Sequence, residues 1–133
     1  MIINKHLLDS LSEQAKANPR LRQHFDLRNT PEDKSQRILN AMEPGTVLPV
    51  HRHRDSSETI VMLRGRGRWH YYDDEGRRTH TFEVSADGDI RGISVPKGQW
   101  HNSEILEEGT VILETKDGAW KPLADEDILM RQQ

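Results

Sequence analysis

Residues 45–65, with the sequence GTVLPVHRHRDSSETIVMLRG, decide the fold and the chemistry of this chain. His51 and His53 stand two positions apart, and a β-strand turns alternate side chains to the same face. Their Cα atoms would then lie about 6.6 Å apart, twice the strand rise of about 3.3 Å. Imidazole rings at that separation can reach one metal ion at about 2.0–2.1 Å from each nitrogen. The pair predicts a metal site, with a solvated or hydrogen-bonded pair as the alternative.

Glu58 is the nearest candidate for a further ligand. It follows His53 by five positions, so an unbroken strand would turn it to the opposite face. Residues 54–57, with the sequence RDSS, are polar and prone to turns. A corner or bulge there would aim the carboxylate back at the histidines. The spacing therefore predicts a bend between His53 and Glu58.

A second segment, PKGQWH at residues 96–101, places another histidine at the start of a strand. The Pro-x-Gly turn before His101 would deliver its imidazole from a neighbouring strand. The chain has no cysteine, so a metal must be held by imidazole and oxygen ligands. We predict one divalent transition metal (Zn, Fe, Ni or Mn) at His51, His53, Glu58 and His101.

Around these segments, short runs of β-forming residues alternate with turn residues, which is typical of an all-β sandwich or barrel. The predicted strands are 36–42, 46–53, 59–63, 67–73, 79–84, 92–95, 100–105 and 110–115. Before them, apolar residues recur at helical spacing from Leu7 to Ala15, and Asn4 is a suitable N-cap. Residues 20–34 are highly charged without a clear period and predict an irregular connection. The polar tail after residue 118 is expected to wrap the outside, with Trp120 as an anchor.

Composition narrows the classes of function. The 133 residues are 33% hydrophobic and 31% charged, with a net charge of −3, and no basic stripe with interleaved aromatics suggests nucleic-acid binding. No apolar run approaches the roughly 20 residues that cross a bilayer. The first residues also lack the apolar core and cleavage site of a signal peptide. We expect a cytoplasmic protein with no membrane partner.

Two spacings in the sequence resemble the motifs of the cupin superfamily. The first is Gly45-x5-His51-x-His53-x4-Glu58-x6-Gly65, and the second is Pro96-x-Gly98-x2-His101. The second departs from the family pattern at Ile90, where a glycine is usual, and at Ile105, where an asparagine is usual. Neither departure falls on a ligand, so the four-ligand site stands.

A closer resemblance is to the WbuC-type cupin metalloproteins, often encoded near bacterial surface-polysaccharide genes. It covers roughly residues 20–128 and includes the stretches SQRILNA (35–41), HRH (51–53), QWH (99–101) and ETKDG (114–118). It implies an all-β cupin double-stranded β-helix, a small barrel or jelly roll, with an N-terminal helical extension. Residues 1–34 would form the helix and its connection, and residues 35–133 the barrel, in a single structural domain. It also implies a homodimer, but no reaction.

Two charged residues are low-ranking candidates for catalysis. Arg37 could line the cavity, but a surface salt bridge is the favoured alternative. Glu114 stands in a segment that otherwise reads as buried, and an inward carboxylate would need a partner or a raised pKa. An outward-facing edge residue paired with Lys116 or an arginine is the favoured alternative for Glu114.

The ligand pocket itself is less well defined by the sequence. Trp69, Tyr71 and Trp100 could form an aromatic wall for a sugar, although core packing explains each of them too. Met62 shares the face of Glu58 by parity and is expected to pack the interior. His70 and His80 are expected to be exposed cross-strand neighbours rather than ligands.

The metal site leaves two classes of function open. One is an enzyme acting on a small, carbohydrate-derived substrate, as an isomerase, epimerase, lyase or, with Fe(II), a dioxygenase. The other is a metal-containing module that binds a sugar or small acid without turnover. An acid or base beside the metal would favour the isomerase, epimerase or lyase, whereas an apolar cavity would favour dioxygen chemistry or binding.

Overall fold

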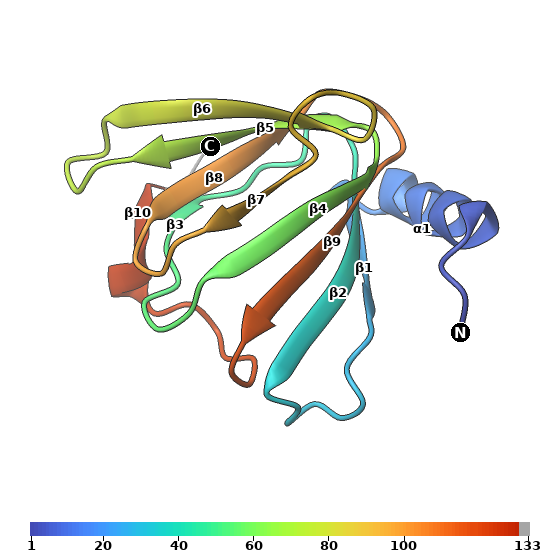
Figure 1. The fold of residues 1–133 in the computed structure, drawn as a ribbon, viewed down its shortest axis with the longest axis horizontal. Coiled ribbons are helices and arrows are strands. Elements are labelled where there is room, and N and C mark those ends of the chain that lie inside the picture. The colour runs from blue at the N-terminus through green and yellow to red at the C-terminus, as the bar shows by residue number, and fades with distance from the viewer. Residues whose placement is uncertain (131–133) are drawn as a thin grey trace.

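A computed structural model describes residues 1–130 of the chain. Two five-stranded antiparallel sheets face each other across the core (Figure 1). Sheet A has the strand order β1 (Arg22–Asp26), β2 (Ser35–Met42), β9 (Thr110–Asp117), β4 (Glu58–Arg64) and β7 (Gly92–Val95). Sheet B has the order β10 (Ile128–Met130), β3 (Val50–His51), β8 (Trp100–Ile105), β5 (Arg66–Tyr72) and β6 (Arg78–Ser85). The predicted all-β class, with two packed sheets and an N-terminal helix, is confirmed.

The main core lies between the two sheets and follows from residue alternation. In β4, Ile60 and Met62 are buried, whereas Thr59 and Val61, which alternate with them, are exposed. A strand with one solvated face produces this period of two. The buried apolar residues of this cluster are Met42, Ile60, Met62, Trp69, Val84, Ile105 and Ile112.

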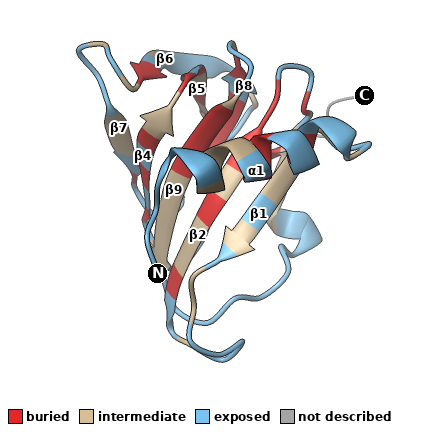
Figure 2. Ribbon diagram, turned by 90° about the vertical axis from the view of Figure 1, so that its right-hand side faces the viewer, coloured by how far each residue is buried: buried red, intermediate tan, exposed pale blue. Residues whose placement is uncertain are grey.

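The helix α1 (Lys5–Ala17) covers the outer face of sheet A and forms a second core. Asn4 begins it as predicted, since its side-chain oxygen accepts a hydrogen bond from the Leu7 amide at 3.0 Å. Leu11 and Ala15 pack against Leu39 of β2. Figure 2 shows the helix lying across β1, β2 and β9 with its outer side exposed. No helix within residues 1–130 is long and apolar enough to cross a membrane.

The prediction of an irregular connection over residues 20–34 is wrong for β1. This strand pairs with β2, with Arg22 opposite Met42 and His24 opposite Asn40. Phe25, on the other face, packs into the core beneath α1. The strand was missed because polar residues occupy almost every position of an edge strand, which hides the period of two.

The segments before and after the barrel motifs also differ from expectation. The predicted strand 46–53 shortens to Val50–His51, because Pro49 has no backbone N–H to give to a ladder. The tail forms a 3-10 turn, η1 (Asp125–Asp127), and then β10, which pairs with β3. Trp120 is 59% exposed, so its expected role as an anchor is wrong.

Gly65 marks the crossing from sheet A to sheet B between β4 and β5. Its φ of +92° lies in the region that favours glycine, and an added Cβ would overlap Thr110. The last glycine of the first cupin spacing is therefore explained by close packing at this crossing.

Candidate metal centre

Three histidines converge between the sheets from two strands and the loop that follows β3. His51 of β3 is the register partner of His101 of β8, and His53 follows in the loop. The ring centroids lie 4.4 Å apart for His51 and His101 and 5.1 Å apart for His51 and His53. One nitrogen from each ring can be chosen so that all three lie within 4.8 Å of one another. The structure thus brings together three of the four predicted ligands.

Backbone carbonyls orient two of these rings. His51 Nδ1 lies 2.9 Å from the carbonyl oxygen of Pro49, and His101 Nδ1 lies 2.9 Å from that of Gln99. A carbonyl only accepts, so each Nδ1 carries the proton and Nε2 keeps its lone pair. This arrangement is typical of metal-ligating histidines.

Glu58 lies beside the third ring. Its Oε2 is 3.0 Å from His53 Nε2, yet that buried nitrogen has no aligned hydrogen-bond partner, and neither does His101 Nε2. Two donors bound to one ion at about 2.1 Å and at right angles would also lie about 3.0 Å apart. The orphaned nitrogens and this spacing fit a metal ion, and Glu58 as the fourth ligand stays a prediction.

The corner that the sequence required is present between β3 and β4. β3 ends at His51 and β4 begins at Glu58, with residues 52–57 outside both strands. The amide of Gly98 donates a hydrogen bond to the carbonyl of His53 at 2.8 Å, which ties the corner to the turn before β8. The two segments that carry the cupin spacings are therefore joined by a backbone hydrogen bond as well as by the converging histidines.

The electrostatics of the site favour the neutral forms of His51 and His101. Burial, together with the neighbouring His101, lowers the pKa of His51 to about 4. Burial likewise lowers the pKa of His101. Burial acts to raise the pKa of Glu58, but the adjacent His53 and His101 outweigh it and bring the net pKa below its usual range. Neutral imidazole and ionised carboxylate are the forms that bind a divalent ion.

Glu114 lies inside the barrel, so its favoured outward-facing interpretation is wrong. In the ladders it sits between Ile38 of β2 and Ile60 of β4, on the inner face of sheet A. Asn40 Nδ2 donates a hydrogen bond to Glu114 Oε1 at 3.1 Å. Burial raises the pKa of Glu114 to about 7, and the charge of Glu58 contributes to the rise. A second carboxyl group, which releases its proton only near neutral pH, thus lines the same cavity as the histidine triad.

Arg37 faces away from this site, and its candidacy as a catalytic residue is wrong. Its Nη2 donates a hydrogen bond to the carbonyl of Leu27 at 3.0 Å and lies 3.5 Å from Asp33. Arg37 and Asn40 are three positions apart on β2 and take opposite faces. Asn40 is the one that reaches the cavity.

The aromatic wall is not assembled as predicted. Trp69 packs in the core and lines the cavity, and Met62 is a core residue that does not line it. Tyr71 instead packs against Phe82, with ring centroids 5.1 Å apart. Trp100 lies on the outer face of sheet B. Alternation along β8 places His101 inside and therefore Trp100 outside.

His70 corrects another expectation, because it is only 5% exposed. Its Nδ1 lies 2.9 Å from the hydroxyl of Thr81, and its register partner is Thr81 rather than His80. His70 lies on the face of β5 opposite to Trp69 and is not part of the triad. The expectation that it is not a ligand therefore agrees with its position.

The cavity that contains the triad has a volume of about 250 Å³. Sequence reasoning missed several polar residues in its lining, among them the basic residues Arg20, Arg22, His24 and Lys116. Lys116 could have been found, since it stands two positions after Glu114 and shares its face in a strand. Arg22 and His24 needed β1 to be recognised first.

A family described as a domain of unknown function (DUF6016) matches residues 3–84, which is more than half of the chain. This chain belongs to that family. No curated protein matches it.

Two solved structures resemble this chain in fold. The chain is similar to the capsular polysaccharide assembling protein CapF from Staphylococcus aureus, with 23% identity and a TM-score of 0.66. That match covers 79% of this chain and 30% of CapF. It is also similar to oxalate decarboxylase from Bacillus subtilis, with 23% identity and a TM-score of 0.57, over 82% of this chain and 27% of the other. Both are cupin-fold proteins, so the DUF6016 chain has a cupin fold and spans under a third of each neighbour's length.

Proposed function

We propose that this DUF6016 protein is a divalent-metal cupin that catalyses proton transfer on a small, carbohydrate-derived molecule. The observation that carries the proposal is Glu114, a buried second carboxylate that faces the same cavity as the histidine triad. Burying an ionisable group without need costs free energy. A proton-transfer role accounts for that cost, whereas a module that only binds does not require it.

In this proposal, metal binding and proton transfer are assigned to different residues. His51, His53, His101 and Glu58 would hold the metal, which would polarise a ligand oxygen as a Lewis acid when bound. Glu114 would give or take the proton, because its pKa of about 7 lies near neutral pH. Asn40 occupies Oε1 of this carboxylate and leaves Oε2 for the transfer.

The identity of the metal and of the substrate belongs to the same proposal. Three imidazoles and one carboxylate suit Mn, Fe, Ni or Zn, and a study of the similar oxalate decarboxylase concerns its Mn(II) centres. Mn(II) is therefore the first metal to test. The resemblance to WbuC-type cupins and the similarity to CapF support a carbohydrate-derived substrate, linked to surface polysaccharide metabolism in the cytoplasm.

Metal content tests the centre directly. Protein purified without added nickel is expected to carry about one divalent ion per chain by elemental analysis. His101→Ala is expected to lose that ion, whereas His80→Ala, an exposed histidine outside the triad, is expected to keep it. Absence of stoichiometric metal in the parent protein, or its full retention in His101→Ala, would overturn the centre.

Proton transfer can be tested before the substrate is known. Metal-loaded protein is incubated in D2O with a panel of uronic acids and ketoses, and loss of carbon-bound hydrogen is followed by NMR. Glu114→Gln is expected to slow any exchange by about 10²- to 10⁴-fold while retaining metal. Exchange at an unchanged rate in Glu114→Gln would remove this residue from the proposal. Ligand binding without exchange in the parent protein would favour a binding module.

A further inference from the structure

The mouth of the metal cavity carries basic side chains from β1. Arg22 and His24 alternate on this strand and lie beside Met42 and Asn40 on the inner face of sheet A. Arg20, just before β1, lines the same cavity. The mouth is therefore basic, although the whole chain has a net charge of −3.

Arg20 and Arg22 form no ion pair with a carboxylate within residues 1–130. Arg28 shows the contrast, because its Nη2 lies 2.7 Å from Asp26. Arg22 Nη1 donates to the carbonyl oxygen of Val47 at 3.1 Å, which holds its side chain at the mouth. A guanidinium has five N–H donors in a planar fork that matches a carboxylate or phosphate. Arg22 thus keeps donors for a ligand.

Deeper in the cavity, a lysine faces the carboxylate of the predicted fourth metal ligand. Lys116 Nζ lies 3.8 Å from Glu58 Oε2, and Glu58 belongs to the metal centre if the proposed function holds. A bound divalent ion would add further positive charge to a lining that contains Arg20, Arg22 and Lys116. The lining also holds the carboxyl groups of Glu58 and Glu114, but Lys116 already faces Glu58. Among the described residues of the lining, the positive charge without a carboxylate partner therefore lies at Arg20 and Arg22, where it attracts anionic ligands.

We propose that the cavity selects small anionic molecules, whose carboxylate or phosphate is bound by Arg20 and Arg22 while the rest of the molecule reaches the histidine triad. The inference rests on the proposed function and names its substrate class. The cavity of about 250 Å³ falls below the range of about 300–1,000 Å³ typical of drug-sized ligands. A single anionic sugar or small acid fits this size better than an oligosaccharide.

Calorimetry on the Mn(II)-loaded protein tests the inference with three probes: D-glucuronate, D-glucose 6-phosphate and D-glucose. At least one anion is expected to bind about tenfold or more tightly than glucose, and the two anions separate carboxylate from phosphate recognition. The double variant Arg20→Gln/Arg22→Gln is expected to weaken that anion about 10- to 100-fold, the scale of one or two charge-assisted hydrogen bonds. Its affinity for glucose and for Mn(II) is expected to stay unchanged.

Arg91→Gln is the matched control, since it removes the same charge from an exposed loop outside this cavity. Equal loss of anion affinity in Arg91→Gln would reduce the effect to overall charge and overturn the inference. So would equal binding of glucose and both anions, or no anion binding at millimolar concentration. Manganese content is measured in the same samples: a parent protein without metal overturns the proposed function, whereas a metal-loaded protein without anion preference overturns only the present inference.

Discussion

At the scale of single residues, two carboxyl groups in one cavity have pKa values shifted in opposite directions. Glu58 lies 3.0 Å from a histidine nitrogen and 3.8 Å from a lysine ammonium, and its pKa falls below the usual range. Glu114 is buried and accepts a hydrogen bond from the neutral Asn40 amide, and its pKa rises to about 7. Carboxyl groups whose pKa values are shifted in opposite directions are typical of sites in which one group stays ionised and the other transfers a proton.

The raised pKa of Glu114 predicts how stability depends on pH in the metal-free protein. The folded state binds the proton more tightly than the unfolded state, so protonation of Glu114 stabilises the folded state. This contribution to the free energy of unfolding is complete below pH 4.5 and is lost as pH rises through about 7. Between pH 5 and pH 8, the parent protein is expected to lose about 2 kcal/mol relative to Glu114→Gln in urea unfolding with a chelator present. Glu108→Gln, an exposed substitution, is the control. A difference between parent and Glu114→Gln that does not vary with pH would contradict the assignment.

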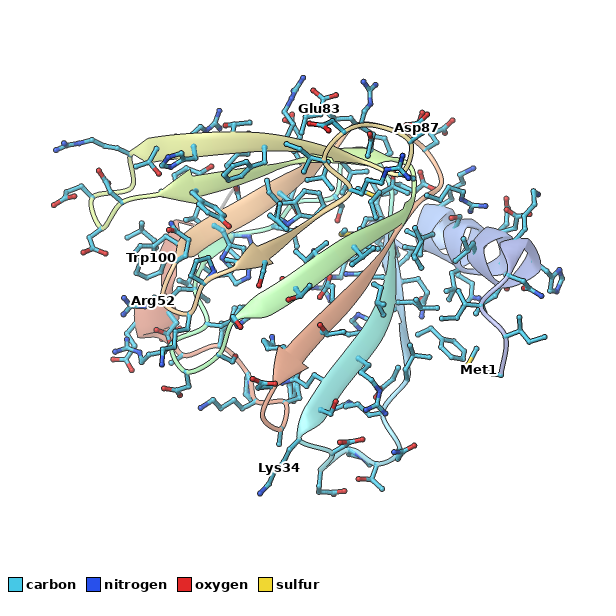
Figure 3. All side chains as sticks on the ribbon, in the orientation of Figure 1. Met1, Lys34, Arg52, Glu83, Asp87 and Trp100 are labelled. Carbon is cyan, nitrogen blue, oxygen red and sulfur yellow. The ribbon has the colours of Figure 1, made fainter. Side chains whose placement is uncertain are left out.

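At the scale of elements, β3 is too short to position His51, and His53 in the loop after it, by strand pairing alone. It has two residues and one register partner in β8. Arg52, between His51 and His53 in sequence, places its guanidinium 4.4 Å from the Trp100 ring, and Figure 3 shows the two labelled side chains close together. Its Nε also lies 3.0 Å from Asp127.

Asp127, in the C-terminal segment, contacts both arginines that flank His53, and we call this arrangement the clamp. Its carboxylate also contacts Arg54 Nη2 at 2.9 Å, and its backbone carbonyl accepts from the Arg52 amide at 3.0 Å. The arginines before and after His53 are thus tied to one carboxylate. Residues that orient metal ligands from outside the coordination sphere commonly change metal affinity by about 10- to 100-fold.

We therefore predict that Asp127→Ala raises the Kd for Mn(II) about 10- to 100-fold, measured by competition with a chelating dye. Lys121→Ala is the control, because it removes an exposed ion pair with Asp55 from the same segment. Circular dichroism at the assay temperature shows whether each variant is folded. Equal Kd values for folded Asp127→Ala and Lys121→Ala would show that the clamp does not position the ligands.

At the scale of the whole molecule, the metal would join the two halves of the fold. Its predicted ligands come from β3 and β8 of sheet B, from the loop after β3, and from the first residue of β4 in sheet A. A ligand that binds only the folded state stabilises it by about 2.7 kcal/mol when its free concentration exceeds the Kd 100-fold. An ion across the two sheets therefore contributes to stability as well as to chemistry.

Chelation is expected to lower the Tm by roughly 10 °C from that of protein in excess Mn(II), following the scaling of Tm with stability for a domain of this size. Differential scanning calorimetry measures the shift, and restored metal is expected to reverse it. The His51→Ala variant serves as the reference, since its Tm is expected not to respond to Mn(II). If the Tm of the parent protein were the same with and without Mn(II), that result would contradict a metal site that bridges the two sheets.

The association of whole molecules stays a prediction from the resemblance to cupins. A homodimer of the 15.4 kDa chain is expected to sediment at about twice the monomer mass. Sedimentation equilibrium at several protein concentrations measures this directly. A single monomeric species throughout that range would contradict the expectation.

The sequence by itself determined the fold class and the histidines that meet. Spacing within one segment decides which side chains share a face, and this local rule sufficed for His51 with His53 and for the bend before Glu58. The turn residues between short strands likewise located most of the strands in sheets A and B. These features depend on neighbours along the chain, so they can be read without knowledge of the packing.

Only the tertiary structure decided what surrounds the metal centre. Glu114 faces inward because β9 pairs with both β2 and β4 in one register, and a shift of one residue would have turned it outward. Arg22 reaches the cavity because an edge strand, hidden by its charges, adds to β2. Asp127 acts near the histidines from a segment more than 70 positions away. Register and long-range pairing depend on free energies summed over the whole fold, so local sequence patterns do not specify them.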